Sequence, residues 1–404
     1  MTVTVAEVRH ARRAGADVVR RTPVLASQTL SERSGGTVVL KAESLQRTGS
    51  FKIRGALNKL DALGDECRTG VVCGSAGNHA QALAAAARAR GVPCEVVMPA
   101  DAPIAKAEGA AALGAKVILE GESVTECLAA AHERAQQGGM TFVHPFDDEH
   151  IIAGQGTLGL ELLEDVEDLA RILIPVGGGG LAAGVAVAVK DARPDVDVIG
   201  IQVETFPALA ASLEAGHPVD VAPPLTTIAD GIAVKRPGEI TLPLLASYLD
   251  GVAMVSEDEV ADAMVVLLEK AKLVVEGAGA VGAAALLGGH VEPAPHGTTV
   301  VVLSGGNVDA GLLATVARRH ETESGRRIAL ITRVPDRPGH LARLLVCVAE
   351  AGANLVEVEH VREGIDLHVR ETAVQLVLET RGRDHAQDVL RAIAGAGYDA
   401  RVLR

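Results

Sequence analysis

One lysine stands where covalent chemistry with a carbonyl compound is feasible. Lys52 follows a Gly-Ser-Phe turn (49–51) and precedes a helical pattern that begins at residue 53. A lysine near a helix start, beside other cationic side chains, is disfavoured as an ammonium, so its neutral amine becomes accessible for a Schiff base. Taken alone, the segment fits an ordinary solvated lysine at a helix N-terminus better.

A second segment could bind an anionic group. In CGSAGNHAQALA (73–84) a strand, a small-residue turn and a helix follow one another. Backbone N–H groups at the helix start suit a carboxylate, and Asn78 could donate a hydrogen bond to a ligand oxygen. An asparagine helix cap with glycines for turn geometry explains the same residues equally well.

A third segment, IPVGGGGLAAG (174–184), has four consecutive glycines between a strand and a helix. Such a loop forms a nest of N–H groups, and only glycine lets the backbone approach a phosphate closely. No lysine follows as in a P-loop, and the register does not match G-x-G-x-x-G, which disfavours an NAD-binding oxidoreductase. Because a strand and a helix pack tightly on both sides of the glycines, a phosphate cradle is favoured over a flexible glycine loop.

A fourth segment is VVVLSGGNVD (300–309), in which Ser304 ends an apolar run. The serine would lie at the same sheet edge as the glycine turns, where α/β proteins bind ligands. A serine cap for the following helix is the alternative interpretation.

The elements that must position these residues are short apolar strands alternating with Ala-rich helices up to about residue 320. Continuous apolar strands followed by helices indicate parallel βαβ units with both sheet faces covered, hence an α/β fold. The strands are expected at 37–41, 70–74, 94–99, 115–120, 171–176, 196–202 and 299–306.

The pattern changes after a polar stretch, 321–327, which we interpret as a linker between domains 1–320 and 328–404. The second domain has the order strand, helix, strand, strand, helix, strand. That order is the split βαβ unit of a ferredoxin-like domain.

Composition excludes some classes of function. The formal net charge is -14, with two Tyr, four Phe and no Trp, so nucleic-acid binding is disfavoured. No uncharged apolar run reaches the length of a membrane span. Five scattered cysteines fit a reducing compartment, and we expect a cytoplasmic protein.

Taken together, SFKIRGA (50–56), SAGNHAQ (75–81), GGGGL (177–181) and SGGN (304–307) resemble the fold-type II, tryptophan synthase beta-like, pyridoxal-phosphate enzymes. The resemblance covers residues 5–320 and is closest to the threonine dehydratase (threonine ammonia-lyase) family, with serine dehydratases and serine racemases as cousins. It implies a catalytic domain of two parallel-sheet subdomains, the smaller (about 50–150) inserted in the larger, and pyridoxal 5'-phosphate as cofactor.

The resemblance also implies roles toward the cofactor. Lys52 would form the Schiff base and later act as the base at Cα, and Phe51 would pack beside the ring. Asn78 would bond the phenolic oxygen and Ser304 the pyridine nitrogen. The phosphate would be bound by the backbone of Gly177, Gly178, Gly179, Gly180 and Leu181.

For the substrate, the resemblance implies a carboxylate site in the turn of Ser75, Ala76 and Gly77, with Asn78. L-threonine would yield 2-oxobutanoate and ammonia by α,β-elimination of water, and L-serine would yield pyruvate. A neutral serine leaves the pyridine a weak electron sink, which favours expulsion of a β-leaving group. Racemases of this family carry a second serine where this chain has Ala76, and a methyl group cannot deliver a proton.

Other residues near these motifs are assigned no chemistry. Related enzymes bind a cation near a glutamate such as Glu204, but the partner aspartate falls at Ala210, so no metal is predicted. Glu276 is expected behind the site at most, and His79 is expected to be a structural residue.

The segment VPDRPGHLARLL (334–345) resembles an ACT domain, a small-molecule regulatory module. An amino-acid effector such as isoleucine or valine would bind between two chains, which implies a homodimer or homotetramer. The candidate residues are Gly339, His340, Leu341 and Asn354. A purely structural dimerisation domain is the alternative.

Three rival functions remain at this point. One is a dehydratase for serine or hydroxyaspartate, another is a residual racemase, and the third is a non-catalytic amino-acid sensor. The presence of Lys52, Asn78 and Ser304 argues against the sensor. Both isoleucine biosynthesis and threonine catabolism are compatible with the leading prediction.

Overall fold

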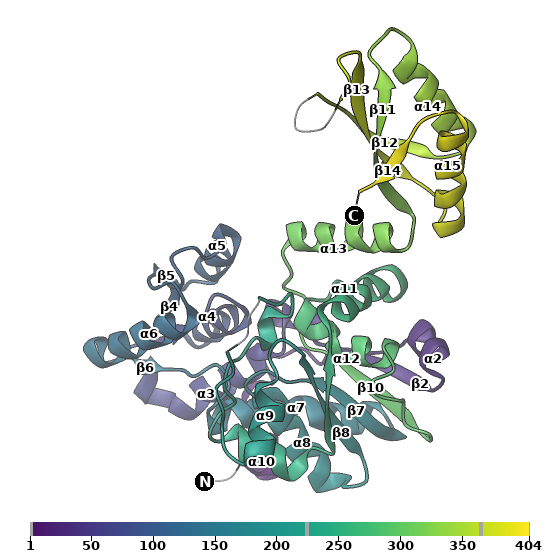
Figure 1. Cartoon of the computed structure of the whole chain (residues 1–404). Helices are drawn as coiled ribbons and strands as arrows, with labels where there is room; N and C mark the ends of the chain where they lie inside the picture. The colour runs from purple at the N-terminus through teal and green to yellow at the C-terminus, as the bar shows by residue number, and fades with distance from the viewer. Residues whose placement is uncertain (1–2, 223–225, 363–366, 404) are drawn as a thin grey trace. The chain divides into compact units, whose positions relative to one another are not determined.

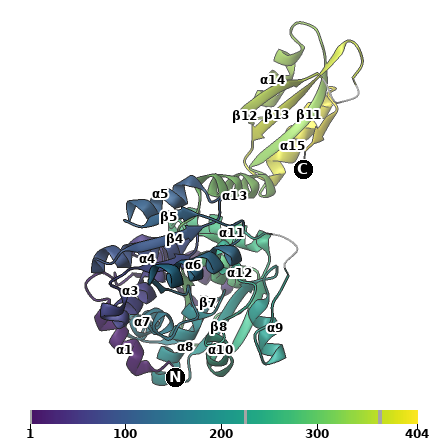
Figure 2. The same ribbon diagram turned by 90° about the vertical axis from the view of Figure 1, so that its left-hand side faces the viewer.

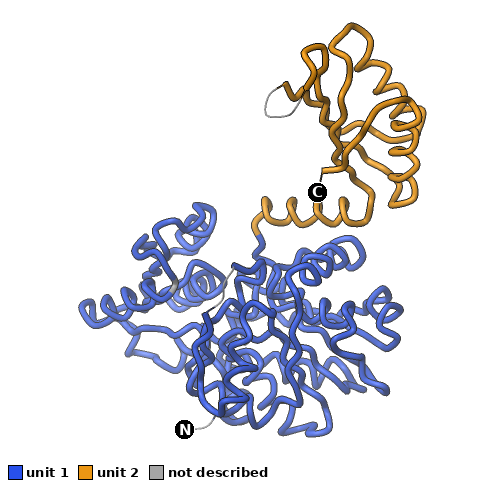
Figure 3. Tube along the Cα trace, viewed as in Figure 1, with its two compact units in different colours: residues 1–308 blue, residues 309–404 orange. Residues whose placement is uncertain are grey.

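A computed structural model describes residues 3–222, 226–362 and 367–403. The chain divides into two compact units, residues 1–308 and 309–404 (Figure 3). Unit 1 contains all four motifs. Unit 2 begins with a helix and contains the segment expected to be regulatory.

The larger sheet of unit 1 has six strands, all parallel except the first, which runs antiparallel to its neighbour. Their order across the sheet is β1 (Val24–Ala26), β2 (Thr37–Ala42), β10 (Thr298–Leu303), β7 (Leu169–Pro175), β8 (Asp197–Val203) and β9 (Gly251–Val255). β10, the last strand of the unit, pairs with β2, one of the first. This pairing brings the end of the SGGN strand beside the segment that leads to Lys52.

Helices cover both faces of this sheet (Figure 1). One face shares a core with α1 (Val5–Ala14), α7 (Glu149–Asp165), α8 (Gly180–Ala192) and α10 (Thr241–Tyr248). The Gly- and Ala-rich α12 (Gly277–Leu287) packs along β7 to β10 on the other face. The remaining helices are α2 (Gln28–Ser34), α9 (Ala208–Ala215) and α11 (Glu257–Val266).

The smaller sheet is fully parallel, in the order β5 (Lys116–Leu119), β4 (Cys94–Met98), β3 (Val71–Gly74), β6 (Thr141–Phe142). Its helices are α3 (Lys52–Leu63), α4 (Asn78–Arg90), α5 (Ile104–Ala112) and α6 (Val124–Gly138), which face the viewer in Figure 2. The predicted α/β fold with two parallel-sheet subdomains is therefore confirmed.

Unit 2 contains an antiparallel sheet in the order β12 (Asn354–Val361), β13 (Glu371–Glu379), β11 (Arg327–Pro335), β14 (Ala400–Val402). With α14 (His340–Glu350) and α15 (Arg383–Gly395) it has the predicted strand and helix order. The first helix of the unit, α13 (Ala310–Glu323), runs into the stretch 321–327 that was expected to be a linker. The domain boundary there remains a prediction.

Within the described ranges, no helix is both long and apolar enough to cross a membrane.

Candidate active site

Lys52 is the first residue of α3, and its amine is held by a backbone carbonyl. Lys52 Nζ donates a hydrogen bond to the oxygen of Pro145 at 2.8 Å and lies 5.3 Å from the centroid of the Phe51 ring. The Phe51 N–H donates to the carbonyl of Ser304 at 3.1 Å. The interpretation of Lys52 as an ordinary solvated lysine is therefore wrong.

The pKa of the Lys52 amine is changed more by burial than by neighbouring charges. Burial lowers the pKa of Lys52 to about 8, and the Glu276 carboxylate opposes that shift. Adjacent cations were expected to disfavour the ammonium form. That expectation is wrong for Arg54, because its guanidinium is paired with the carboxylates of Glu43 and Glu161.

The four glycines 177–180 join β7 to α8 and form a tightly packed cradle. Gly179 has φ +98°, and a Cβ there would lie 2.9 Å from Cβ of Thr241. A Cβ on Gly178 would clash with the Phe146 ring. No side chain caps α8, whose N-cap is Gly179, so its first N–H groups are available to an anion. The cradle therefore fits a phosphate group.

Asn78 is the first residue of α4, with its side chain held from two sides. Its Nδ2 donates to Glu276 Oε1 at 2.7 Å, and its Oδ1 accepts from Asn307 Nδ2 at 2.7 Å. The N-cap of α4 is Gly77, without a side-chain cap bond, so the helix-cap interpretation of Asn78 is wrong. The two contacts fix the amide orientation and leave one N–H of Nδ2 for a ligand.

Glu276 is in direct contact with the site, because it accepts the hydrogen bond from Asn78. It is buried, and burial, with the nearby Asp230 carboxylate, raises its pKa to about 7, while the hydrogen bond from Asn78 acts in the opposite direction. A carboxyl group that titrates near neutrality beside Asn78 can influence the charge of Lys52.

Ser304 and the turn 75–77 complete the site. Ser304 follows β10 directly and is buried; α13 takes Asp309 as its N-cap, so the interpretation of Ser304 as a helix cap is wrong. In the turn, Ser75 Oγ accepts the Gly77 N–H at 3.2 Å. A Cβ on Gly77 would meet nothing within 4 Å, which leaves open space for a small ligand.

Two further segments close the site and were missed by the sequence analysis. Pro145 and Phe146 lie between β6 and α7; one contacts the lysine and the other packs on the glycine cradle. Asn307 was quoted in the SGGN motif without a role, yet its Nδ2 donates to both Asn78 and the carbonyl of Thr48. Asn307 could have been predicted from its motif. Pro145 could not, because it contributes only a backbone carbonyl, which every residue has.

Other sequence candidates lie apart from this centre. His79 contacts the carbonyl of Val143 at 3.0 Å and burial lowers its pKa to about 3, as suits a structural residue. Glu204 is exposed at the end of β8. Nowhere in residues 3–222, 226–362 and 367–403 do three or more His, Cys, Asp or Glu gather to hold a metal ion.

The effector candidates lie in unit 2 and are not gathered within one chain. Gly339, with φ +87°, precedes α14, and His340 and Leu341 begin that helix. Asn354 begins β12, beyond the far end of the 11-residue helix, and bonds Glu379. A helix of this length spans about 16 Å, so the four residues could meet only between two chains.

Comparison with known proteins gives a consistent result. Residues 16–305 match the family described as pyridoxal-phosphate dependent enzymes. The L-threonine ammonia-lyase of Thermotoga maritima is 45% identical over 404 residues, covering 99% of this chain and 100% of its own. The catabolic L-threonine dehydratase of Escherichia coli K12 is 41% identical over 318 residues, 78% of this chain and 96% of its own.

Solved structures agree. Maize serine racemase superposes with a TM-score of 0.75 at 34% identity, covering 80% of this chain and 99% of that chain. The processed form of threonine deaminase isoform 2 from Solanum lycopersicum superposes with a TM-score of 0.73 at 34% identity. The match covers 78% of this chain and 86% of that chain.

Proposed function

The chain belongs to the threonine ammonia-lyase family of pyridoxal-phosphate-dependent enzymes, and we propose that Lys52 is the lysine with which it deaminates L-threonine to 2-oxobutanoate and ammonia. The observation that carries this role is the setting of Lys52. Its amine, with a pKa of about 8, lies against Pro145, whose neighbour Phe146 packs on the glycine cradle.

The surrounding residues fit pyridoxal phosphate. The N–H groups of residues 177–181 would hold the phosphate, and Phe51 would pack beside the ring. Ser304 would bond the pyridine nitrogen, and the free N–H of Asn78 would bond the phenolic oxygen. When bound, the cofactor supplies an electron sink for the charge that develops at the substrate Cα.

The substrate carboxylate is assigned to the turn Ser75, Ala76 and Gly77 and to the first N–H groups of α4, where the helix dipole favours an anion. Lys52 would remove the proton from Cα, and this proton balances the one that the β-hydroxyl takes up when it leaves as water. Hydrolysis then returns one water and releases ammonia and the 2-oxo acid. L-serine, which lacks one methyl group, would give pyruvate by the same steps.

Elimination is favoured over racemisation by two residues. The neutral hydroxyl of Ser304 does not hold the pyridine nitrogen protonated, so the ring is a weak sink and charge at Cα is used to expel the leaving group. Ala76 has no proton to return to the opposite face of Cα. An assay on L-threonine, L-serine and D-serine should therefore show deamination of the L-amino acids and little serine racemisation.

The direct test is Lys52→Ala. Purified protein incubated with pyridoxal phosphate should be yellow, and Lys52→Ala should lose this absorbance and reduce threonine deamination by about 10³-fold or more. Lys116→Ala, which removes an exposed lysine of β5, should keep both. A colourless wild-type protein, or a Lys52→Ala variant as active as wild type, would refute the proposal.

For unit 2 we propose a regulatory role. An amino acid such as isoleucine or valine would bind near Gly339, His340 and Leu341 of one chain and Asn354 of another, in a homodimer or homotetramer. The order of strands and helices and the left-handed Gly339 support this assignment. Calorimetric titration with both amino acids, alongside threonine kinetics, tests it; absence of heat and of any kinetic effect would contradict it.

We also propose a cytoplasmic location, which is supported by five cysteines that are all free thiols, as expected in a reducing compartment.

A further inference from the structure

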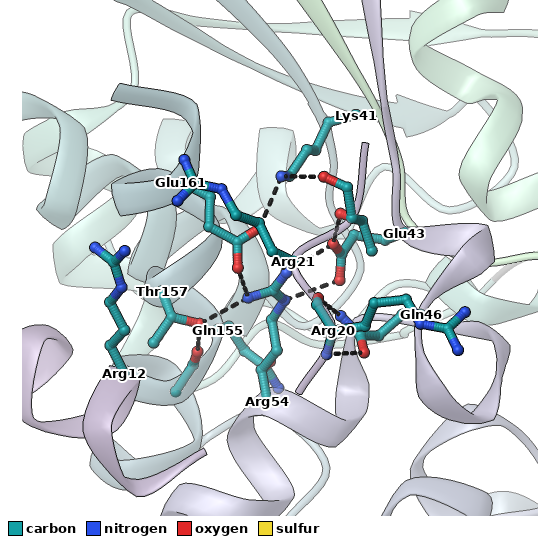
Figure 4. A network of polar contacts seen from close by, with 12 residues as sticks. Arg12, Arg20, Arg21, Lys41, Glu43, Gln46, Arg54, Gln155, Thr157 and Glu161 are labelled. Atoms are coloured by element: carbon teal, nitrogen blue, oxygen red, sulfur yellow. Dashed lines mark hydrogen bonds and ion pairs between the residues drawn. The ribbon is translucent and has the colours of Figure 1, made fainter. Parts of the chain in front are cut away.

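A buried ion network surrounds Arg54, two residues after Lys52 (Figure 4). Arg54 Nε and Nη2 donate to the two oxygens of Glu43 at 2.9 and 2.8 Å. Nη1 and Nη2 donate to the two oxygens of Glu161 at 2.7 and 3.0 Å, and Nη1 also donates to Thr157 Oγ1 at 3.1 Å. All five N–H groups of the guanidinium are thereby used. We call Arg54, Glu43 and Glu161 the clamp.

The clamp is nearly inaccessible to water, and its charges are compensated. Arg54 is 2% exposed, Glu43 0% and Glu161 6%. The fully buried Lys41 adds a second cation, donating to Glu161 Oε2 at 2.7 Å and to the carbonyl of Thr22 at 2.8 Å. Buried ion pairs return little more free energy than their desolvation costs. We therefore attribute to this network a fixed geometry of the elements it joins, and not a large gain in stability.

The clamp joins three elements that are distant in sequence. Glu43 follows β2, Arg54 belongs to the first turn of α3, and Glu161 belongs to α7. α3 and α7 also touch through their backbones, because a Cβ on Gly154 would lie 2.5 Å from Cα of Gly55. The backbone contact and the guanidinium, which is held from both sides, together fix the position of α3 on α7.

Both partners of the Lys52 hydrogen bond depend on this contact. Lys52 begins α3, and Pro145, which accepts its hydrogen bond, lies just before α7. The start of α3 has no side-chain cap of its own. Upstream, Thr48 adopts φ 64°, a conformation that is unfavourable for a β-branched residue. The first turn of α3 is therefore held by Arg54, together with the Gly55 N–H, which donates to Gln155 Oε1 of α7 at 3.1 Å, and the Phe51 N–H, which donates to the carbonyl of Ser304.

We propose that Arg54 is a positioning residue of the reaction, which holds Lys52 Nζ where it must meet the carbonyl carbon of the cofactor. Arg54 contacts neither substrate nor cofactor and acts only through the first turn of α3. The inference rests on the proposed role of Lys52 and adds which residue sets its position. A lysine at residue 54 would keep the charge but offers one nitrogen where two carboxylates need a planar fork.

The test compares Arg54→Lys with Lys41→Met in the full chain. Lys41→Met removes the other buried cation of the network, which bonds Glu161, Asp165 and the carbonyl of Thr22, and it changes no atom of Arg54, Glu43 or Glu161. Three quantities are measured: the unfolding midpoint in urea, the rate at which the apoenzyme incorporates pyridoxal phosphate at Lys52 (fixed with borohydride and read by mass), and kcat and KM for L-threonine per loaded site.

Arg54→Lys should lower kcat by about 10²-fold and slow incorporation at least about tenfold, since misplacement by about 1 Å has such effects. KM should change by less than about threefold, because the carboxylate turn lies on another element. Lys41→Met should lose stability to a similar degree yet keep kcat and incorporation within about twofold of wild type.

Wild-type rates in Arg54→Lys would overturn the inference, as would losses in both variants proportional to their loss of stability. If Arg54→Lys does not fold, Glu43→Gln, which keeps shape and removes one charge of the clamp, is measured in the same way and should lower kcat about tenfold. A wild-type protein that incorporates no cofactor at Lys52 would refute the proposed function instead. Normal incorporation in wild type and variants alike would refute only the role of Arg54.

Discussion

At the scale of single residues, the charge of Lys52 is balanced between burial and Glu276. Burial lowers the pKa of the amine, and the carboxylate, where ionised, raises it. Glu276→Gln removes the opposing effect, so the pKa of Lys52 should fall below its present value of about 8. More neutral amine is then available at a given pH, and the apoenzyme should incorporate pyridoxal phosphate faster near pH 8.

The difference in incorporation rate between wild type and Glu276→Gln should depend on pH. Because the pKa of Glu276 itself is about 7, the carboxyl is neutral in wild type at lower pH, and the rates of wild type and Glu276→Gln should converge there. Glu204→Gln, at an exposed carboxylate, is the matched control and should follow wild type throughout. Slower incorporation by Glu276→Gln above pH 7, or a constant ratio at all pH values, would contradict this account.

Which site residues could be found from the sequence depended on how they act. Lys52, Asn78 and Ser304 could be predicted because the chemistry proposed for them belongs to their side chains, which stand in distinctive small-residue turns. Pro145 acts through a carbonyl oxygen that every residue possesses. The amide orientation of Asn78 depends on Glu276, which is 198 residues away along the chain, and no local pattern reveals that contact.

At the scale of elements, the contact between α3 and α7 depends on two glycines. A methyl group on Gly154 would lie 2.5 Å from Cα of Gly55 and 2.7 Å from the Arg54 carbonyl, and backbone atoms cannot yield as a flexible side chain can. Gly154→Ala should therefore lower the free energy of unfolding by about 1–3 kcal/mol and loosen cofactor retention, measured by urea unfolding and by dialysis.

Gly109→Ala is the matched control. Gly109 also lies inside a helix, α5, but a Cβ there would meet only Gln81, at 3.8 Å. Removing glycine from an unobstructed helix position should leave stability unchanged or raise it by about 0.4–1 kcal/mol. Equal losses of stability in the two variants would show that packing between α3 and α7 is not the cause.

The seven predicted strands are all present because continuous apolar runs between turns are a strong signal. β1 and β6 were not foreseen; with three and two residues they are too short to show a period. β9 is an apolar run of five residues, a length at which strand and helix interior cannot be told apart. The pairing of β2 with β10 is a contact between the two ends of unit 1, which hydropathy does not encode.

At the scale of the whole molecule, the two units have separate hydrophobic cores. The unit 2 core is built from residues 328–400, with Leu376 of β13 at 0% exposure. The change from α/β alternation to the ferredoxin-like order predicted a division into domains 1–320 and 328–404, whereas the compact units divide between residues 308 and 309.

Separate cores predict separate unfolding. Leu376→Ala should lower the free energy of unfolding of unit 2 by about 2–5 kcal/mol, the usual cost of such a cavity. The absorbance of the lysine-bound cofactor should persist above the temperature at which unit 2 melts, because no residue assigned to the site belongs to that core. Circular dichroism and visible absorbance recorded during the same thermal ramp measure the two events.

Leu158→Ala, in the core of α7 and equally buried, is the counterpart in unit 1. It should lower the temperature at which the absorbance disappears, since α7 carries Glu161 and packs on α3. Deamination of L-threonine at saturating substrate should then fall on heating in Leu158→Ala well before it does in Leu376→Ala. If Leu376→Ala instead shifts the loss of absorbance as far as Leu158→Ala does, the two units unfold as one and cofactor retention depends on both.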